Sequence, residues 1–458
     1  MKNTQVYNHL KHIFFSAVER VDPYKMIKNS ITLKENMLNI EIENKEMSLE
    51  LERFNRIFVI GAGKATAKMA KAIEEIFSGK ITEGIIAVKY GHTEPMQSIK
   101  TIEAGHPVPD ENSIKAAIEI EKISRLTDDK TLFLNLISGG GSALLTSPIR
   151  CSIGSETIQL TLDDIQRTTK VLLSCGAPID EMNCIRKHLS NIKGGKLARL
   201  LYPATQVNII LSDVVGDKLD TIASGLTTFD DTTYKHALKI VNKYKIQEKI
   251  PLKVLKVLKS GVDGLIEETP KRNDPVFSRV HNILIGTNYT ALIAASKKAQ
   301  SLGYNTAVLS SQITGEARET ARIFFGIAKD IKEHNLLLTK PGCVIGGGET
   351  TVTLRGAGKG GRNQELALSF LSEMQKNNEQ TEDIYFLSAS TDGNDGPTDA
   401  AGAFASLNIL KESKRKSLNI EEYLNNNDSY NFFKKAGYLL KTGPTNTNVC
   451  DIQVAIVK

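Results

Sequence analysis

Short apolar runs alternate with helical stretches through the first half of the chain. Four runs have the composition of buried strands, at residues 56–60, 85–88, 132–137 and 207–211. Apolar residues at helical spacing fill intervals between them, for example at 113–126 and 162–175. Because strands that alternate with helices form βαβ units, this half predicts an α/β fold with a parallel sheet. Ahead of these runs, residues 5–30 predict a helix that ends near Pro23, and alternation at 38–42 and 49–51 predicts a small strand pair.

A charged passage at 243–274, with prolines at 251, 270 and 275, interrupts this pattern. We expect it to be less regularly structured, and we place the domain boundary there, with one domain at 1–265 and a second at 276–458. The pattern then restarts, with expected elements at 283–285, 291–302, 306–309, 316–333 and 384–389. Residues 411–431 are polar and predict an exposed excursion with a short helix.

Composition narrows the class of protein. A chain of 458 residues is too long for one ordinary core, and 41% hydrophobic with 24% charged residues is typical of a soluble globular protein. We expect no transmembrane helix and no secretory signal, because no long apolar run exists. The five cysteines are scattered, which favours reduced thiols and a cytoplasmic location over a zinc site or disulfides. A net charge of +6 suits small anions and is too diffuse to indicate nucleic acid.

The richest glycine stretch runs from 344 to 368. One cluster (Gly346, Gly347, Gly348) precedes Glu349, Thr350 and an alternating pattern that predicts a strand, and a second cluster at 356–361 leads into a helix expected to open at Asn363. Glycine allows close approach to the backbone, and exposed N–H groups at a helix start bind anions. Arg362 there could hold an anion through two parallel hydrogen bonds, or it could brace its own loop. A plain glycine-rich hairpin is the alternative for the whole stretch.

A strand–glycine–helix pattern at 59–70 resembles a dinucleotide fingerprint and departs from it twice. Gly61 and Gly63 are present, but Thr66 stands at the third glycine, and Lys89 stands where an NAD site has an acid. Lys64 on the first helical turn suits a phosphate or carboxylate. The alternative for Lys64 is a solvated surface lysine.

A second strand-end turn lies at 136–145. Ser138, Gly139, Gly140, Gly141 and Ser142 make an anion nest with two hydroxyl donors, or simply a tight βα turn. Glycine turns at the ends of two parallel strands favour a shared ligand crevice, because ligands bind at that edge of a sheet.

A basic run at 185–198 contains Arg186, Lys187 and Lys193. Such runs are usually solvated faces, but the two glycines after Lys193 indicate that the backbone approaches something there. We interpret His188 as a hydrogen-bonded helix residue rather than a base.

Carboxylates follow two of the expected strands. Asp213 directly follows the strand at 207–211, and a carboxylate is costly to bury there without a partner, so it is a candidate general base or Mg²⁺ ligand. Asp392, Asp395 and Asp399 lie in 390–403, where Mg²⁺ or substrate contacts compete with an Asx-turn scaffold.

The ordered set of motifs resembles a known family. G-A-G-K-A, G-H-P-V-P-D-E-N-S at 105–113, S-G-G-G-S-A-L, R-K-H-L-S-N-I-K-G-G, S-D-V-V-G-D, G-G-E-T-T-V-T-L-R-G, G-G-R-N-Q-E-L-A and T-D-G-N-D-G-P-T-D-A-A-G-A occur in this order over about residues 59–455. Together they are similar to the class II glycerate 2-kinases, whose C-terminal portion is called MOFRL. Some members of that family have carried the label hydroxypyruvate reductase.

The resemblance implies a fold and an activity. It implies a Rossmann-like N-terminal domain with a mainly parallel sheet, a smaller mixed α/β C-terminal domain, and an active site between them. The implied reaction is ATP-dependent phosphorylation of D-glycerate at the 2-hydroxyl, giving 2-phosphoglycerate, with ATP and Mg²⁺ or another divalent cation as cofactors. The expected partners are small molecules, without nucleic acid or membrane, in a monomer or homodimer.

We expect three groups of site residues. The catalytic group is Lys64, Asp213 and Arg362, and the metal group is Asp392 and Asp395. The group expected to bind substrate or nucleotide is Gly61, Gly63, Ser138, Gly139, Gly140, Gly141, Ser142, Arg186, Lys187, Lys193, Gly347, Gly348, Glu349, Thr350 and Asn363.

The chain departs from the family pattern at Leu226, Gly346, Asn446 and Cys450, which we interpret as turn and packing variations bearing on substrate preference. Three functions compete. A kinase needs cations for the transferring phosphoryl group and a carboxylate for the hydroxyl proton, and both are present. A dehydrogenase lacks its fingerprint here, and an anion sensor would need no Asp213.

Overall fold

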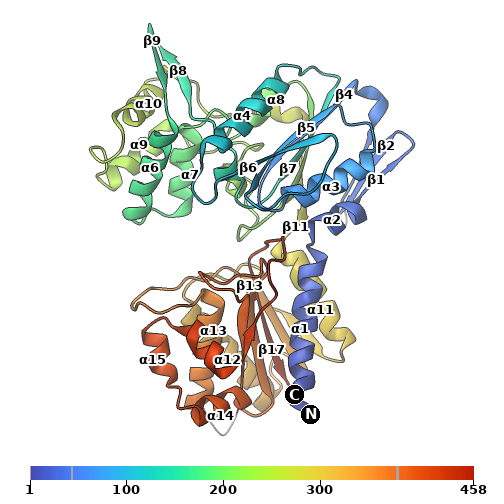
Figure 1. Cartoon of the computed structure of the whole chain (residues 1–458), viewed down its shortest axis with the longest axis vertical. Helices are drawn as coiled ribbons and strands as arrows, with labels where there is room; N and C mark the ends of the chain where they lie inside the picture. Colours follow the sequence, from blue (N-terminus) through green and yellow to red (C-terminus); the bar gives the residue numbers. More distant parts are fainter. Residues whose placement is uncertain (1, 43–44, 378–380) are drawn as a thin grey trace. The chain divides into compact units, whose positions relative to one another are not determined.

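The computed structural model describes residues 2–42, 45–377 and 381–458. The chain forms two compact units, of which one is Met26–Ile285 and the other joins Met1–Lys25 to Gly286–Lys458 (Figure 1). These units differ from the expected domains, 1–265 and 276–458, in two ways. The boundary falls at residue 285, and the N-terminal segment belongs with the second half of the chain.

The unit Met26–Ile285 is built on a six-stranded sheet of order β11-β10-β7-β4-β5-β6. Its strands are β4 (Arg56–Ala62), β5 (Glu83–Lys89), β6 (Ile99–Ala104), β7 (Thr131–Ile137), β10 (Thr205–Leu211) and β11 (Val280–Gly286). The pairings from β10 through β7, β4 and β5 to β6 are all parallel. Counted by sequence, the order is that of a Rossmann-type doubly wound sheet, whose order reverses between β4 and β7. The expected Rossmann-like architecture is confirmed.

These strands are continuous apolar runs in the sequence because both faces of the sheet are buried. Every residue of β7 is buried, and only Arg56 of β4 is not. Phe58 and Phe133 lie side by side with ring centroids 5.3 Å apart, and neither has exposed surface. Full burial of each ring stabilises the fold by about 1.5–3 kcal/mol. Helices α3 (Thr66–Phe77) and α4 (Glu111–Ser124) pack on this sheet.

A helical region beside the sheet has its own apolar core (Figure 1). It contains α6 (Leu162–Ser174), α7 (Ile179–His188), α9 (Tyr234–Lys243) and α10 (Leu252–Val262), and the hairpin β8 (Arg150–Ile153) and β9 (Glu156–Gln159) is also part of it. The expectation of a less structured passage at 243–274 is therefore wrong over α10. Its positions 254, 257 and 258 are buried in an amphipathic pattern that the surrounding lysines concealed.

Shorter elements complete this unit. The strands β1 (Ile31–Lys34), β2 (Met37–Ile42) and β3 (Lys45–Glu50) form an antiparallel sheet, as expected for the last two. The remaining helices are α2 (Pro23–Ser30), which begins three residues before this unit, α5 (Gly141–Leu144) and α8 (Lys196–Leu201). Single 3-10 turns lie at η1 (Leu51–Arg53), η2 (Ile222–Ser224) and η3 (Pro275–Arg279).

The other unit contains a mixed sheet of order β12-β13-β17-β14-β15-β16. Its strands are β12 (Asn305–Val308), β13 (Gly342–Gly348), β14 (Ile384–Ser390), β15 (Gly402–Ser406), β16 (Leu439–Leu440) and β17 (Asp451–Val457). Only β12 and β13 pair in parallel, and β17 runs antiparallel to both β13 and β14. The expected mixed α/β character is confirmed.

Helices cover both faces of this mixed sheet (Figure 1). One layer holds α12 (Ala317–His334) and α13 (Arg362–Lys376), and the other holds α1 (Lys2–Arg20) and α11 (Asn288–Ser301). The side chains of Tyr7 and His9 bond to Ser406 and Tyr304, at 2.5 Å and 2.8 Å, which fixes α1 in this unit. The expected helix at Asn363 is confirmed within one residue.

Two local expectations in this unit are wrong. A strand was expected after the first glycine cluster, but the strand found here, β13, ends with that cluster at Gly348. Residues 352–361 form a loop. The second cluster packs against 426–429, where a Cβ at Gly358 would lie 2.5 Å from the carbonyl oxygen of Asn426. The expected polar excursion at 411–431 overlaps three helices, α14 (Leu407–Arg415), α15 (Ile420–Asn425) and α16 (Ser429–Ala436).

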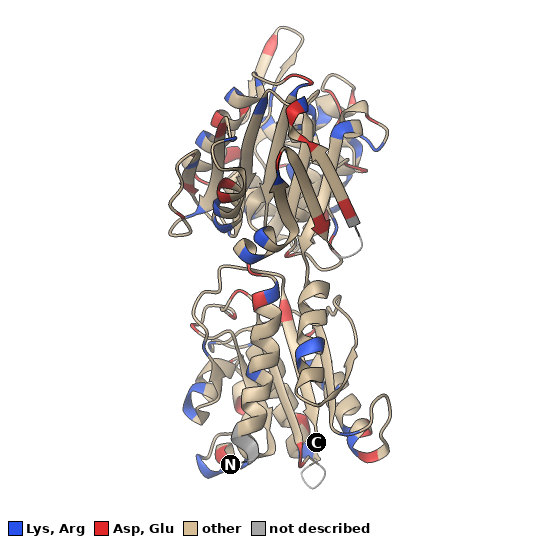
Figure 2. Ribbon diagram, turned by 90° about the vertical axis from the view of Figure 1, so that its right-hand side faces the viewer, with Lys and Arg blue, Asp and Glu red and all other residues tan. Residues whose placement is uncertain are grey.

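Charged side chains of both signs are interspersed over the helices and loops of each unit (Figure 2). Across the described part of the chain, no helix is both long enough and apolar enough to cross a membrane.

Candidate active site

The glycine turns after β4 and β7 meet where the order of the parallel sheet reverses. The amide of Lys64 donates to the carbonyl of Gly139 at 2.9 Å, and the amide of Ser138 donates to the carbonyl of Ala62 at 3.1 Å. This edge, at the carboxyl ends of the strands, is where doubly wound folds bind ligands. The two turns that were expected to share a ligand crevice therefore meet within one unit.

Glycine is required in these turns because the chains approach closely. A Cβ at Gly63 would lie 2.0 Å from Ser138 Oγ, and one at Gly61 would lie 2.2 Å from the carbonyl oxygen of Leu136. Ser138 is 1% exposed, and its hydroxyl accepts from the amide of Ala65 at 3.1 Å. Gly61, Gly63 and Ser138 thus build the turn and position the start of α3.

The carboxylate of Asp213 lies against the second glycine turn. A Cβ at Gly139 would be 1.8 Å from Asp213 Oδ2, so any larger residue would displace that carboxylate. A Cβ at Gly140 would lie 2.9 Å from the ring of His106 and 3.3 Å from Cγ of Lys64. The structure therefore brings together Lys64, Asp213 and the Gly139–Gly140 backbone.

His106 was assigned no role from the sequence, although it lies in the quoted run at 105–113. Burial and the nearby Lys64 ammonium lower its pKa to about 4, so the ring is neutral near pH 7. Lys64 forms no ion pair with any carboxylate in the described ranges. A lysine, a neutral imidazole and a carboxylate thus lie together at the expected strand-end crevice.

Ser142 begins a chain of hydrogen bonds toward α7. Its hydroxyl is 2.8 Å from that of Ser224, which donates to Asn183 at 3.0 Å. Ser224 and its neighbour Ala223 have φ of 58° and 49°, in the left-handed region that non-glycine residues rarely adopt. This strained turn was not predicted from the sequence.

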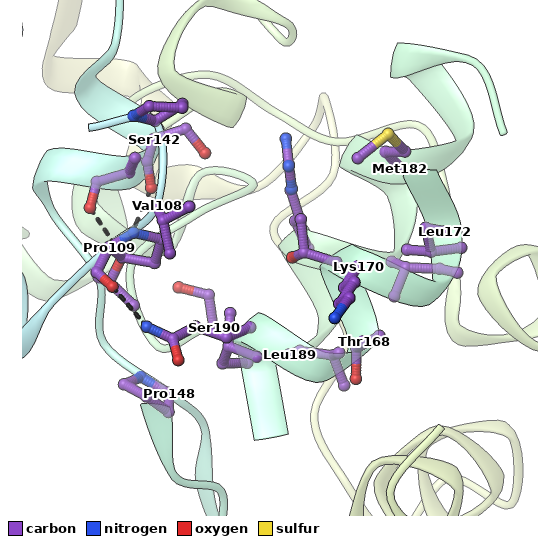
Figure 3. A pocket seen from close by; sticks show the side chains of 18 of the residues that line it. Val108, Pro109, Ser142, Pro148, Thr168, Lys170, Leu172, Met182, Leu189 and Ser190 are labelled. Atoms are coloured by element: carbon purple, nitrogen blue, oxygen red, sulfur yellow. Dashed lines mark hydrogen bonds between the residues drawn. The ribbon is translucent and has the colours of Figure 1, made fainter. Parts of the chain in front are cut away.

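A cavity of about 680 Å³ opens beside the same glycine turn (Figure 3). His106, Gly140 and Ser142 line it on the sheet side, and residues of α6 and α7 line it opposite. Figure 3 shows Val108, Pro109 and Ser142 on one side and Leu172 and Met182 on the other.

Arg186 and Lys193 also line this cavity. Lys193 is 5% exposed, and its ammonium donates to the carbonyl of Leu145 at 3.1 Å. Burial and the neighbouring guanidinium lower the pKa of Lys193 to about 7, and burial lowers the pKa of Arg186. Both residues suit the predicted role in binding an anion.

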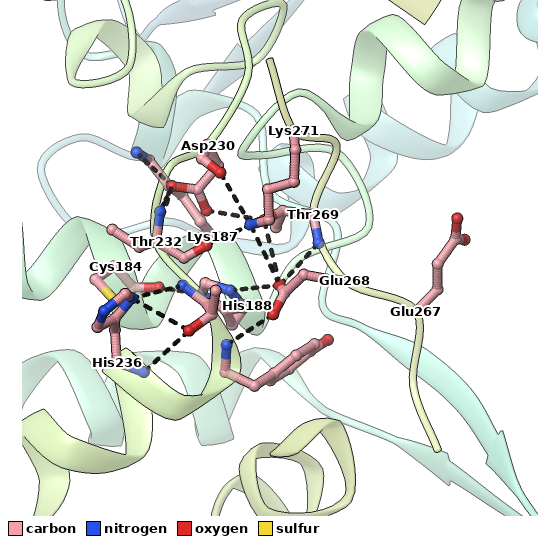
Figure 4. Close-up of polar contacts among 12 residues, drawn as sticks. Cys184, Lys187, His188, Asp230, Thr232, His236, Glu267, Glu268, Thr269 and Lys271 are labelled. Carbon is pink, nitrogen blue, oxygen red and sulfur yellow. Dashed lines mark hydrogen bonds and ion pairs between the residues drawn. The ribbon is translucent and has the colours of Figure 1, made fainter. Parts of the chain in front are cut away.

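Lys187 lies elsewhere, in a buried polar network (Figure 4). Its ammonium pairs with Asp230 at 3.3 Å and Asp220 at 3.2 Å. In the same network His188 Nε2 is 2.8 Å from Glu268, which agrees with its interpretation as a hydrogen-bonded helix residue. The expected ligand role of Lys187 does not fit, because its charge is already compensated inside the fold.

In the other unit, several predicted residues gather at one edge of the mixed sheet. The ends of β13 and β14 flank the start of β17, where Gly348 and Ser390 both pair with Asp451. Arg362, at the first position of α13, binds Asp451 through Nε at 2.5 Å and Nη2 at 3.0 Å, and Glu349 through Nη1 at 2.7 Å. Asp451 has no exposed surface, and the sequence did not identify it.

Asp395 does not fit the expected metal role. Its Oδ1 accepts from the amide of Asn363 at 3.1 Å, and its Oδ2 accepts from the amide and side chain of Gln364 at 2.8 Å and 2.9 Å. Burial and the nearby Asp451 raise the pKa of Asp395 to about 6. The carboxylate caps the N-terminus of α13, and Asn363 is held in the same cluster, accepting from Ser388 at 2.6 Å.

The remaining predicted residues here are mostly structural. A Cβ at Gly347 would lie 2.2 Å from Asn288 Oδ1, and one at Gly348 would lie 2.2 Å from the carbonyl oxygen of Ile313. Asp392 accepts from Ser390 and from the amide of Asn394, both at 2.9 Å, which is an Asx-turn arrangement. Thr350 is 3% exposed, and within the described ranges its hydroxyl has no partner. Among those residues no cluster of three metal-ligating side chains occurs.

The fold and the strand-end residues together are typical of Rossmann-like α/β enzymes, which bind ligands at this edge of the sheet. A family described as a domain of unknown function (DUF4147) matches residues 9–259, and the MOFRL family matches 342–451. The chain is 39% identical to the glycerate 2-kinase of Pyrococcus horikoshii, over 96% of this chain and 95% of the relative. It is also 39% identical to the D-glycerate 2-kinase of Thermotoga maritima, over 95% and 99%.

Solved structures agree with these relatives. The crystal structure of the Thermotoga maritima glycerate kinase superposes with a TM-score of 0.85 at 37% identity, covering 99% of this chain and 100% of that one. A Pyrococcus horikoshii protein superposes with a TM-score of 0.83 at 38% identity, covering 99% and 98%. The chain belongs to the class II glycerate 2-kinase family.

Positions that depart from the family pattern lie in packing or turn environments. Leu226 and Cys450 are 2% and 3% exposed, and a Cβ at Gly346 would lie 2.7 Å from the side chains of Ile313 and Phe324. Asn446 and Cys450 have φ of 60° and 69°. Their interpretation as turn and packing variations fits these surroundings.

Proposed function

We propose that this protein transfers the γ-phosphoryl group of ATP to the 2-hydroxyl of D-glycerate, giving 2-phosphoglycerate and ADP. The observation that carries the proposal is near full-length similarity, at 39% identity, to proteins named glycerate 2-kinase and D-glycerate 2-kinase. The strand-end crevice supplies the groups that phosphoryl transfer needs.

Each catalytic residue has a defined task in this proposal. The ammonium of Lys64 neutralises charge on the transferring phosphoryl group, while Asp213 accepts the proton of the 2-hydroxyl. Asp213 is suited to this because Gly139 leaves space for its carboxylate. His106 is neutral near pH 7 and offers a hydrogen bond without adding charge. Arg362 is kept as the third proposed catalytic residue, and its guanidinium, 30% exposed, already pairs with Asp451 and Glu349.

A divalent cation fits this chemistry even where few protein side chains coordinate it. Mg²⁺ is commonly held by one or two carboxylates together with the substrate phosphates. Asp213 would hold it in the strand-end crevice as the alternative to its role as base, and Asp392 is a second candidate in the other unit. When bound, the ion supplies positive charge to the phosphate oxygens.

A reductase is the second candidate, since a relative 37% identical over 98% of this chain is named putative hydroxypyruvate reductase. Thr66 and Lys89 oppose it, because an NAD site needs a third glycine and an acid at these positions. ADP release measured with glycerate and ATP, against NAD(P)H absorbance with hydroxypyruvate, separates the two. Phosphorus NMR of the product identifies the hydroxyl, and 3-phosphoglycerate as the main product would overturn the assignment.

We also infer that the enzyme works in the cytoplasm as a monomer or homodimer. Five free cysteines support a reducing compartment.

A further inference from the structure

The geometry points to the cavity between the β7 turn and helices α6 and α7 as the nucleotide site, with the purine base on its apolar wall and the phosphates at Arg186 and Lys193. The inference rests on the proposed function for the identity of the nucleotide. It assigns ATP to the unit Met26–Ile285. It also states that this cavity holds the nucleotide and not D-glycerate, a distinction that the list of predicted site residues does not make.

The size and lining of the cavity argue for the larger substrate. Its volume of about 680 Å³ falls within the range of about 300–1,000 Å³ typical of sites for drug-sized ligands. D-glycerate has three carbons and carries a polar group on each, so it would leave most of the space empty. Much of the lining is apolar, including Val108, Leu172, Met182 and Leu189, and such a surface suits the face of a purine ring.

The cations in the wall argue for an anionic ligand. Arg186 forms no hydrogen bond or ion pair with any described residue, and Lys193 has only the carbonyl of Leu145 as an acceptor. A buried ammonium without a carboxylate is costly unless another anion compensates it. Two neighbouring lysines have more partners than Lys193. The ammonium of Lys187 pairs with two carboxylates, and that of Lys196 donates to two carbonyls. Arg186 and Lys193 thus bring positive charge to the cavity wall without a carboxylate partner among the described residues.

The position of these cations sets the direction of the ligand. Lys193 bonds to Leu145, which directly follows the turn that holds Gly140 and Ser142. His106, Gly140 and Ser142 line the cavity at that end, and Gly140 also adjoins the side chain of Lys64. The phosphates therefore point toward Lys64 and Asp213, and the base points toward Leu172 and Met182 on α6 and α7 (Figure 3).

Photolabelling of the full-length protein with 8-azido-ATP tests the location. We expect the label on peptides from 162–188, with protection by excess ATP and no protection by D-glycerate. Label confined to peptides from 286–458 would overturn the inference, and so would protection by D-glycerate alone.

Calorimetry with ADP tests the role of the cations. Arg186→Met should weaken ADP binding by about 10- to 100-fold, since a charge-assisted contact is lost, while Arg186→Lys should weaken it less. Arg125→Met is the matched control, because Arg125 is exposed at the end of α4, and its ADP affinity should equal that of wild type. Thermal melting of each variant confirms folding, which is expected because Arg186 has no partner to lose.

Two further results separate this inference from the proposed function. If wild type releases ADP with glycerate but Arg186→Met keeps its ADP affinity and raises only the KM for glycerate, the cavity holds the acid and the inference is wrong. If wild type binds ADP at this site but does not phosphorylate glycerate, the inference stands as a nucleotide site and the proposed reaction fails.

Discussion

Arg362 holds the buried carboxylate of Asp451 with two hydrogen bonds, from Nε to Oδ2 at 2.5 Å and from Nη2 to Oδ1 at 3.0 Å. The pairing joins the first residue of α13 to the first residue of β17, which is a central strand of the mixed sheet. From the sequence, this guanidinium was expected either to hold an anion through two parallel hydrogen bonds or to brace its own loop. In the structure, the anion held in this way belongs to the protein itself.

Arg362→Lys should therefore lower stability as well as activity. A lysine keeps the charge but cannot reproduce the fork, so Asp451 loses one of its compensating bonds. We expect a clear fall in Tm together with a fall in kcat/KM. Asp451→Asn, which leaves the guanidinium without its buried partner, should cost about 3–5 kcal/mol of unfolding free energy. Arg355→Lys in the exposed loop is the control, and equal Tm values for the Arg362 variant and wild type would exclude the bracing role.

Asp213→Asn should reduce kcat by about 10²–10⁴-fold, the usual contribution of a general base. The shape of the residue is kept, so KM should change little. Steady-state kinetics over a range of Mg²⁺ concentrations distinguishes the alternative. Recovery of kcat at high Mg²⁺ would identify Asp213 as a metal ligand instead. Asp217→Asn, in the same loop and also half-buried, reports on general disturbance of the loop.

Lys64→Met should reduce kcat/KM by about 10²–10³-fold, as expected when one donor to a developing charge is removed. Because the ammonium has no carboxylate partner in the described residues, Tm should stay within the range of a surface substitution. Lys68→Met, one turn further along α3, is the comparison. A large loss of Tm in Lys64→Met would show that the lysine serves the fold.

The pH dependence of stability should reveal the burial of Lys193. Its pKa is about 7 in the folded protein and near 10.5 when unfolded, so the unfolded chain binds more protons between these values. Stability of the nucleotide-free protein therefore increases as pH rises through this window, by up to about 1.4 kcal/mol per pH unit from this group. Urea unfolding at several pH values should show a smaller slope for Lys193→Met. An unchanged slope would mean that the ammonium stays charged in the fold.

Lys196 contributes in the same direction. Burial lowers its pKa to about 8, so some slope should survive in Lys193→Met. The Lys196→Met variant identifies this remainder, and the double variant should have the flattest profile of the three.

The elements of the parallel sheet were predictable because their signal is local. Strands buried on both faces need continuous apolar runs, and β4, β7 and β10 have them. The turns at Gly63 and Gly140 were also predictable, because tight strand-to-helix turns require glycine and a glycine cluster therefore indicates such a turn.

Partnerships across long stretches of chain were not predictable. Arg186 and Lys187 are adjacent, yet one lines a cavity and the other pairs with Asp230, because successive helical residues point about 100° apart. No pattern in the sequence around Lys187 indicates that Asp230 is its partner. For the same reason Asp451 was not foreseen as the partner of Arg362, nor α11 as the helix that covers α1.

The placement of α1 has a consequence for biosynthesis. Residues 2–25 are synthesised before the unit Met26–Ile285, but they belong to the other unit, which is completed by strand β17. The whole unit Met26–Ile285 is thus an insertion, and it can fold while the apolar face of α1, which includes Leu10, Ile13 and Phe14, still lacks its partners. That face must be kept from other contacts until β17 has been synthesised, so the nascent chain offers chaperones an amphipathic helix while the unit Met26–Ile285 is being made.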